Sequence, residues 1–180
     1  MDIKKRKNLT KIINLNNFDL GVEIGVFKGE YSKFLLENCP NLFMYCVDLW
    51  DSSAMSKKNM YNGDELFEKV FLEFQEKYKD RFSLMRKSSV EASYCFENNS
   101  LDFIYIDADH SYSAVCRDIE SWWKKLKIGG LFGGHDYSSA GIKGVIKAVS
   151  KYFDNINVTK ERCPSWWLIK ESEDFQIEQN

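Results

Sequence analysis

The chain has two histidines, and each stands beside an aspartate directly after a short apolar run. The pairs are Asp109 with His110 and His135 with Asp136, and a further acid, Asp107, precedes the first pair. Histidine is suited to proton transfer near neutral pH, and a neighbouring carboxylate can orient its ring. One such pair could simply hold a loop in place, but histidines scattered by chance would seldom both fall at these positions. The pattern therefore favours a functional site.

A strand–helix–strand unit places these pairs. Residues 103–106 form an apolar run with the character of a buried parallel strand. Ser111 is a suitable N-cap for a following helix, whose apolar residues recur at helical spacing. Gly129 and Gly130 are expected to end this helix, and a second buried strand is expected to begin at Leu131. A right-handed crossover would bring both strand ends to one edge of a sheet, where open α/β sheets bind ligands.

A glycine turn forms a second candidate site near the start of the chain. Residues 20–24 alternate as a strand does, and Gly25 and Gly29 follow before an amphipathic helix. Such a turn lets backbone N–H groups approach an anionic or carboxylate-bearing ligand. Dinucleotide-binding turns usually read G-x-G-x-x-G, whereas this one reads G-x-x-x-G and is preceded by Glu23. The spacing counts against a nicotinamide or flavin dinucleotide.

Asp48 ends the second predicted strand, where a carboxylate can accept hydrogen bonds from both hydroxyls of a ribose. A surface acid that caps a loop is the alternative, but the order of strand, glycine turn, helix, strand and acid favours ribose binding. Ser88 and Ser89 follow a brief third strand. They could cap a helix or form a hydrogen bond with the edge of an adenine.

The remaining segments complete an alternating α/β pattern. They are a short N-terminal helix within residues 1–17, an exposed loop over 51–62 that could cover a ligand, a helix from Asn62, a strand over 82–85, a helix over 142–153, an antiparallel strand pair within 155–170 and a frayed tail over 171–180. At 180 residues the chain can bury a full core, so residues 1–180 are expected to form a single domain.

Composition limits the partners of the chain. Its hydrophobic share of 44% and charged share of 29% are those of an ordinary globular protein. The net charge of -2 argues against a general nucleic-acid surface, and the basic run over residues 4–7 is explained as the solvated start of the first helix. The sequence shows no signal peptide or membrane span, and its five cysteines form no close pair. A cytoplasmic location with reduced thiols is therefore expected.

From residue 20 to about residue 170 the sequence resembles the class I S-adenosylmethionine-dependent methyltransferases. The likeness rests on the motifs EIGVFKGEYS, VDLW, SSVE, IDADHSY and GGHDY in that order. More narrowly, the chain is similar to the bacterial small-molecule O-methyltransferase branch that includes macrocin O-methyltransferase and cephalosporin hydroxylase-like proteins. The resemblance implies a single-domain, Rossmann-like α/β fold. Its sheet would have seven mostly parallel strands with an antiparallel last strand, and helices on both faces.

The resemblance also implies roles for individual residues. Those implied to contact the cofactor are Glu23, Gly25, Gly29 and Ser32 around its methionine part, Asp48 at the ribose, Ser89 near the adenine, and Asp107. Metal-using relatives hold a divalent ion at the ends of the fourth and fifth strands, which here implies Asp107, His135 and Asp136. His135 departs from the usual acid or amide at that position. A hard ion such as magnesium prefers oxygen ligands, so the identity of the metal is in question.

The implied reaction is methyl transfer to a hydroxyl of a small molecule such as a sugar, a phenol or a natural product. A divalent metal could activate that hydroxyl, or Asp109, His110 or His135 could act as a general base without one. Three alternatives remain: a methyltransferase acting on nitrogen or on a macromolecule, a dehydrogenase with an unusual glycine turn, and a non-enzymatic domain that binds the cofactor. A small-molecule acceptor is the expected partner, nucleic acid and membranes are not, and a homodimer is left open.

Overall fold

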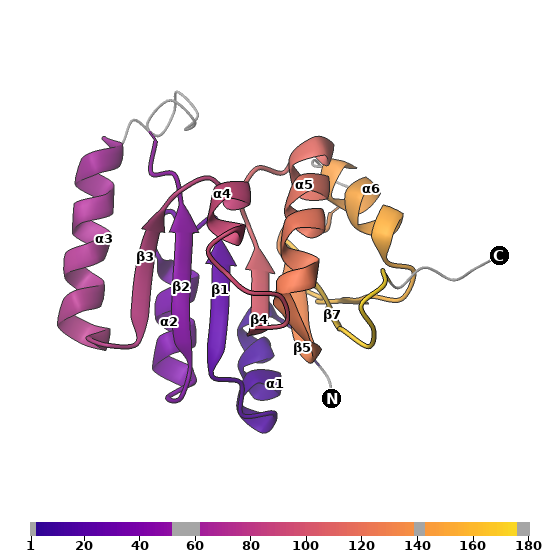
Figure 1. Cartoon of the computed structure of the whole chain (residues 1–180), viewed down its shortest axis with the longest axis horizontal. Helices are drawn as coiled ribbons and strands as arrows, with labels where there is room; N and C mark the ends of the chain where they lie inside the picture. The colour runs from indigo at the N-terminus through magenta and orange to yellow at the C-terminus, as the bar shows by residue number, and fades with distance from the viewer. Residues whose placement is uncertain (1–2, 52–61, 139–142, 176–180) are drawn as a thin grey trace.

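The computed structural model describes residues 3–51, 62–138 and 143–175. Its strands form one sheet in the order β3-β2-β1-β4-β5-β7-β6 (Figure 1). The strands are β1 (Leu20–Ile24), β2 (Phe43–Asp48), β3 (Phe82–Arg86), β4 (Leu101–Ile106), β5 (Leu126–Gly134), β6 (Asn157–Val158) and β7 (Trp166–Ile169). Strands β1 to β5 run parallel, and β7 runs antiparallel to both β5 and β6. The predicted seven-stranded sheet with an antiparallel last strand is confirmed.

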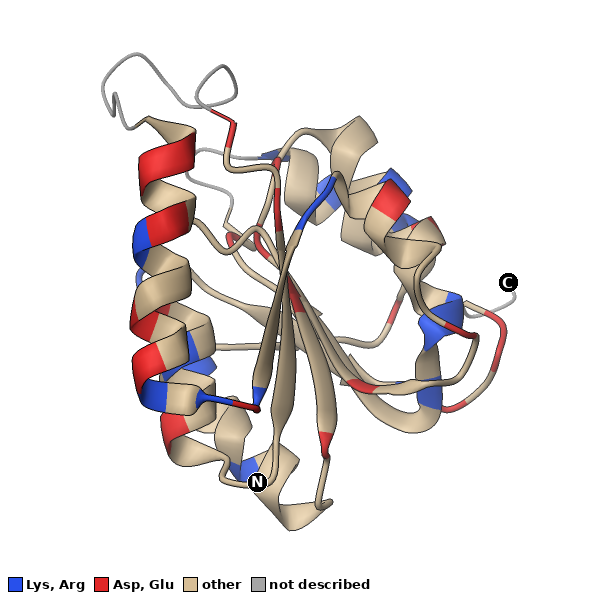
Figure 2. Cartoon of the chain, turned by 60° about the vertical axis from the view of Figure 1, so that its left-hand side comes forward, with Lys and Arg blue, Asp and Glu red and all other residues tan. Residues whose placement is uncertain are grey.

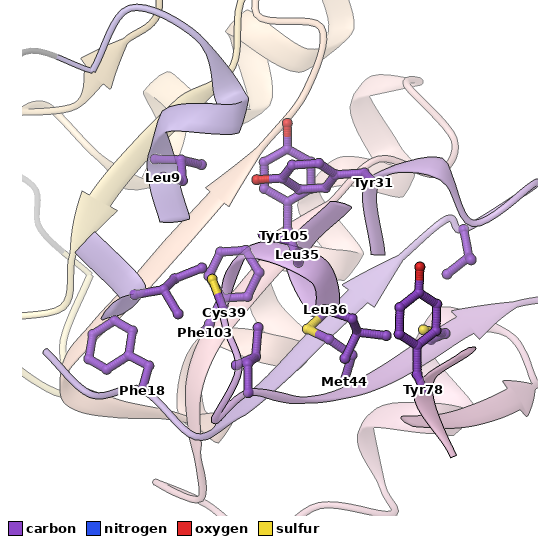
Figure 3. Close-up of a cluster of buried hydrophobic side chains, with 14 of the residues drawn as sticks. Leu9, Phe18, Tyr31, Leu35, Leu36, Cys39, Met44, Tyr78, Phe103 and Tyr105 are labelled. Carbon is purple, nitrogen blue, oxygen red and sulfur yellow. The ribbon is translucent and has the colours of Figure 1, made fainter. Parts of the chain in front are cut away.

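Helices cover both faces of this sheet (Figure 1). The helical segments are η1 (Arg6–Leu9), α1 (Thr10–Leu15), α2 (Glu30–Asn38), α3 (Gly63–Tyr78), α4 (Ser89–Ser93), α5 (Tyr112–Trp122), η3 (Trp123–Lys125) and α6 (Lys143–Tyr152). Buried residues of α1, α2 and α3 belong to one apolar cluster, and those of α4, α5 and α6 belong to another. Figure 3 shows the first cluster, in which Leu36 of α2 and Tyr78 of α3 lie with Met44 of β2. Two clusters arise because successive strand residues point to opposite faces of a sheet.

Strand β4 lies at the centre of the fold. All of its residues are buried, and it pairs with β1 on one side and β5 on the other. The apolar run over residues 103–106 is therefore a central parallel strand, as its sequence predicts. The strand order reverses between β1 and β4, and ligands of open α/β sheets bind at such a point.

The helix before β5 ends earlier than its sequence predicts. Ser111 caps α5 as expected, with its Oγ accepting a hydrogen bond from the backbone N–H of Ala114 at 3.4 Å. However, α5 ends at Trp122, one 3-10 turn follows, and β5 already begins at Leu126. Gly129 and Gly130 lie inside the strand rather than at the helix end, so that prediction was wrong. The reason is tertiary: Leu126 is fully buried and pairs with Leu101 of β4.

The described surface carries charges of both signs. Figure 2 shows acidic and basic residues interleaved along α3, and Glu73 of this helix pairs with Lys33 of α2. Near the other end of the chain, the ring of Phe175 stacks on that of Trp123, with their centroids 5.8 Å apart. Among the described residues, no helix combines the length and the hydropathy of a membrane span.

Candidate active site

A cleft of about 890 Å³ lies at the carboxyl ends of β1, β2 and β4. The turns after these strands, the start of α4 and one side of α5 form its walls. Of the residues that the sequence singles out, the cleft is lined by Gly25, Asp48, Ser88, Ser89, Asp107, Asp109 and His110. The cleft thus lies where the strand order reverses, at the edge expected to bind a ligand.

Backbone geometry explains both glycines of the turn after β1. Gly25 has a φ of +89°, and a Cβ there would lie 2.2 Å from the backbone oxygen of Asp107. Gly29 is the N-cap of α2 with a φ of +71°, and a Cβ there would lie 2.6 Å from the ring of Phe74. Any larger residue would push the turn away from β4 at the first position and from α3 at the second. Only Gly25 of the two lines the cleft.

Asp48 closes this turn from the neighbouring strand. Its Oδ2 accepts hydrogen bonds from the backbone N–H groups of Val26 at 2.9 Å and Phe27 at 2.8 Å. Its Oδ1 accepts from the backbone N–H of Trp50 at 2.8 Å. A carboxylate offers about four acceptor sites, and the described residues occupy three of those of Asp48. Asp48 therefore holds the glycine turn in shape and still lines the cleft, which keeps its assignment to a ribose a prediction.

Glu23 and Ser32 lie together beneath the turn rather than in the lining of the cleft. Both side chains are buried, and the Ser32 hydroxyl donates to the Glu23 carboxyl group. Cys46 Sγ donates in turn to Ser32 Oγ at 3.3 Å. Burial raises the pKa of Glu23 to about 8. Their implied contact with the methionine part of the cofactor stays a prediction.

The serines after β3 are both engaged within the protein. Ser88 is the N-cap of α4 and forms a capping box with Glu91. Ser89 Oγ accepts a hydrogen bond from the indole N–H of Trp122 at 2.9 Å. Beside it on α5 lies the buried carboxyl group of Asp118, whose pKa burial raises to about 6. Helix capping is thus an observed role of Ser88, and both serines also line the cleft.

Both histidines and their acids converge at the ends of β4 and β5. Nε2 of His110 lies 3.5 Å from Oδ1 of Asp107 and 3.3 Å from Oδ2 of Asp136. Nδ1 of His135 lies 3.6 Å from Oδ1 of Asp107 and 3.4 Å from Oδ1 of Asp136. Asp107 raises the pKa of His110 most, Asp136 and Asp109 add to the rise, and burial opposes it. We refer to Asp107, His110, His135 and Asp136 as the acid–histidine cluster.

Asp109 and His110 differ from each other in exposure and in hydrogen bonding. Asp109 is exposed, and its Oδ1 accepts a hydrogen bond from the backbone N–H of Ser111 at 2.8 Å, so it shapes the entry to α5. His110 Nε2 is buried and has no hydrogen-bond partner among residues 3–51, 62–138 and 143–175.

The loop predicted over 51–62 falls outside the described residues except at its two ends.

Comparison with known proteins identifies the family and the fold. The family model described as a methyltransferase domain matches residues 22–137, which include the glycine turn, the cleft and the acid–histidine cluster. The chain belongs to this methyltransferase family. The methyltransferase is of class I and depends on S-adenosylmethionine, as the motifs imply. No curated protein sequence matches it at a significant level.

Solved structures of known proteins share the fold of the methyltransferase at low sequence identity. A putative caffeoyl-CoA O-methyltransferase from Staphylococcus aureus is 14% identical, with a TM-score of 0.68 over 90% of this chain and 80% of that one. The O-methyltransferase TomG from Streptomyces achromogenes, solved in complex with S-adenosylmethionine, is 13% identical, with a TM-score of 0.65 over 91% and 78%. A putative rRNA methylase from Clostridium thermocellum is 12% identical, with a TM-score of 0.69 over 96% and 99%. These neighbours do not distinguish one methyl acceptor from another.

The acid–histidine cluster of the methyltransferase has a geometry that suits a cation. Asp107, His110 and Asp136 each offer one ligand atom, and the three atoms lie within 4.8 Å of one another. The buried Nε2 of His110, which makes no hydrogen bond with any described residue, is the kind of atom that a metal would satisfy. The implied ligand set contains His135 in place of His110, so the structure adds a residue to that set. A mixture of imidazole and carboxylate favours a transition metal over magnesium.

Arg6 is a site residue that the sequence analysis missed. Its Nη1 lies 3.2 Å from Oδ2 of Asp107, and its guanidinium lies 4.9 Å from the ring centroid of Tyr31. The backbone N–H of Arg6 donates to Glu161 at 2.6 Å, which fixes η1 against the segment before β7. The basic run over 4–7 is therefore more than the solvated start of a helix, because one of its members is half-buried in the site. No local pattern could have revealed a contact across such a distance in sequence.

Proposed function

We propose that the methyltransferase transfers the methyl group of S-adenosylmethionine to a hydroxyl of a small molecule, assisted by a divalent metal. The observation that carries this proposal is the position of the acid–histidine cluster. Asp107 and His110 line the cofactor cleft and at the same time converge with Asp136 from the next strand. Cofactor binding alone does not need two histidines and two acids at that point.

The reaction requires little covalent help from the protein. Methyl transfer from a sulfonium is an in-line displacement, so the acceptor oxygen must lose its proton and lie in line with the methyl group. A divalent cation held by Asp107, His110 and Asp136 would lower the pKa of that hydroxyl and fix its direction. Without a metal, the buried Nε2 of His110 is well placed to take the proton, and the flanking carboxylates would stabilise the imidazolium. Asp109 and His135 stay the other candidates for this base.

The class of acceptor is supported by charge and by the neighbours. The described surface has interleaved charges and the whole chain has a net charge of -2, whereas a nucleic-acid substrate favours a basic face (Figure 2). Of the neighbours described above, TomG is an O-methyltransferase involved in tomaymycin synthesis, and the Staphylococcus aureus protein is a putative caffeoyl-CoA O-methyltransferase. The macrocin O-methyltransferase branch, suggested by the motifs, is consistent with both.

The second candidate is methyl transfer to a macromolecule. It is favoured by two structural neighbours, a putative rRNA methylase from Clostridium thermocellum and an rRNA methylase from Streptococcus thermophilus, which both align over 96% of the chain. In that case the cofactor cleft would be unchanged, and only the acceptor would differ.

A binding measurement followed by a transfer assay tests the proposal. S-adenosylhomocysteine is titrated calorimetrically into the full chain, with and without a chelator, and NADH serves as the control ligand. Methyl transfer is then followed by mass spectrometry with hydroxylated phenols, sugars and ribosomal RNA as acceptors, in the presence of Mn²⁺ or the chelator. We expect binding of S-adenosylhomocysteine but not NADH, and Mn²⁺-dependent methylation of a hydroxylated small molecule. Methylation of RNA alone would support the second candidate. Turnover that persists in the presence of the chelator would exclude a role for the metal in the reaction.

A further inference from the structure

The loop that carries His110 connects β4 to α5 and is anchored at both ends. At its start, the backbone N–H of Asp107 donates to the carbonyl of Ile24 at 2.7 Å, which continues the pairing of the sheet. At its end, the backbone N–H of Ser111 donates to Asp109 Oδ1, and Ser111 caps α5. His110 lies between these anchors, so the place of its ring depends on how the loop backbone is held.

The imidazole ring of His110 faces acids without being fixed by them. Its Nε2 lies 3.5 Å from Asp107 and 3.3 Å from Asp136, yet it forms no hydrogen bond with any described residue. A group that acts as a metal ligand or a base must be held to within about 0.5 Å. Packing around the loop backbone therefore has to supply this precision.

Two glycines from other segments pack directly against this backbone. Gly25 contacts the start of the loop, where a Cβ would lie 2.2 Å from the oxygen of Asp107. Gly144, the second residue of α6, contacts the end of the loop. A Cβ there would lie 2.5 Å from the carbonyl oxygen of His110 and 2.8 Å from the backbone nitrogen of Tyr112. Non-bonded atoms prefer separations of about 3.5 Å or more, so a methyl group at position 144 would push the loop and α6 apart.

The first turn of α6 is itself held against α5. Val145 is buried in the same apolar cluster as Val115 of α5. Lys147 Nζ lies 4.8 Å from the ring centroid of Tyr112, the residue at which α5 begins. Because these contacts keep α6 in place, crowding at position 144 would displace the loop. Glycine is a poor helix former, so its presence in α6 also indicates a packing requirement.

We propose that Gly144 is a positioning residue for His110: its lack of a side chain lets α6 pack against the His110 carbonyl and so sets the place of the imidazole beside Asp107 and Asp136. The inference rests on the proposed role of the acid–histidine cluster in the reaction. None of the described residues of α6 lines the cleft, so Gly144 acts through the loop and not by contact with a ligand. A role in helix packing alone is the alternative.

Mn²⁺ binding by Gly144→Ala, with Gly130→Ala as the matched control, separates the two roles. A Cβ at Gly130 would lie 2.9 Å from the backbone oxygen of Asp102, which gives similar crowding near the start of β4, away from the acid–histidine cluster. In calorimetric titration of the full chain, Gly144→Ala should bind Mn²⁺ about 10-fold more weakly or worse than wild type. Gly130→Ala should stay within about twofold of wild type. Denaturant unfolding of both variants measures the general cost of the crowding.

A second readout needs no metal. The chain has two histidines, so NMR of protein with isotope-labelled histidine shows two imidazole rings, and His135→Gln identifies the signals of His110. In Gly144→Ala the ring signals of His110 should shift further than those of His135, whereas in Gly130→Ala both should stay in place. In wild type, a nuclear Overhauser effect is expected between a Gly144 Hα and the amide proton of Tyr112.

The results that would overturn the proposal differ from a failure of the proposed function. Gly144→Ala with wild-type Mn²⁺ affinity and unchanged His110 signals would show that Gly144 serves helix packing alone. Equal losses of Mn²⁺ affinity in both glycine variants would show a general loss of stability. If Gly144→Ala does not fold, absence of the Overhauser effect in wild type would contradict the close contact, and its presence would support it. Wild type that fails to bind Mn²⁺ would contradict the metal of the proposed function, and the His110 signals would then decide the positioning role.

Discussion

The guanidinium of Arg6 lies 3.2 Å from the Asp107 carboxylate, across 101 positions of sequence. It contacts Oδ2, whereas Oδ1 of the same carboxylate faces both histidines of the acid–histidine cluster. The rings of Tyr31 and Tyr105, whose centroids are 4.6 Å apart, lie beside each other in Figure 3, and the guanidinium lies over the first of them. The N-terminal segment thus places a positive charge beside an acid that lines the cleft.

Replacing Arg6 should strengthen metal binding. The guanidinium neutralises part of the Asp107 charge and repels a second cation nearby, so Arg6→Gln is expected to tighten Mn²⁺ binding by roughly two- to fivefold, the range of a partly exposed ion pair. Isothermal titration of Mn²⁺ into the full chain measures the effect. Lys7→Gln removes one charge from the same basic run without reaching Asp107, and it should leave the affinity unchanged. Weaker Mn²⁺ binding by Arg6→Gln would show that Arg6 orients the carboxylate rather than competing for it.

Asp48 should matter for both stability and cofactor binding. Asp48→Ala leaves the backbone N–H groups of Val26, Phe27 and Trp50 without their acceptor, which should cost about 1–3 kcal/mol of unfolding free energy and abolish binding of S-adenosylhomocysteine. Asp48→Asn keeps an acceptor oxygen for the turn, so it should lose less stability but still bind the cofactor product weakly. Denaturant unfolding and calorimetric titration separate the two effects. Wild-type affinity in either variant would exclude Asp48 from the ribose site.

Sequence alone was sufficient for the elements whose signal is local. The alternation of residues 20–24, the apolar run over 103–106 and the cap at Ser111 all depend on neighbours within a few positions, and each appears in the structure as expected. The glycines at 129 and 130 gave a false helix end, because pairing of Leu126 with Leu101 extends the strand through them.

The contacts that sequence could not supply are those set by the packing of distant segments. Arg6 reaches Asp107 from η1, which a hydrogen bond to Glu161 holds in place. Asp118 could have been identified from the sequence. It is an acid between Val115 and Trp122 on the buried side of α5, where an apolar residue would be expected. A buried acid in an apolar helix stripe was therefore the overlooked signal.

Glu23 should make the protein less stable as the pH rises. Its pKa is raised by burial from an ordinary value near 4.5 to about 8, so between these limits the folded state keeps a proton that the unfolded state has lost. Its contribution to the free energy of unfolding therefore falls as pH rises from about 4.5 to about 8. Glu23→Gln mimics the protonated form, and it should equal wild type near pH 4 but exceed it by roughly 2–5 kcal/mol at pH 8. Denaturant unfolding at a series of pH values checks this, and parallel curves for the two proteins would contradict it.

Asp136 should separate cofactor binding from catalysis. It belongs to the acid–histidine cluster but not to the lining of the cofactor cleft, so Asp136→Ala should bind S-adenosylhomocysteine within about twofold of wild type. The same change removes one carboxylate from the group facing His110, and it should lower Mn²⁺ affinity at least tenfold and methyl transfer by a factor of about 100 or more. Calorimetry with each ligand and turnover on the acceptor found in the mass-spectrometric screen provide the three values. Full turnover with weakened Mn²⁺ binding would show that the metal does not take part in the reaction, because the cation would then bind beside a site that works without it.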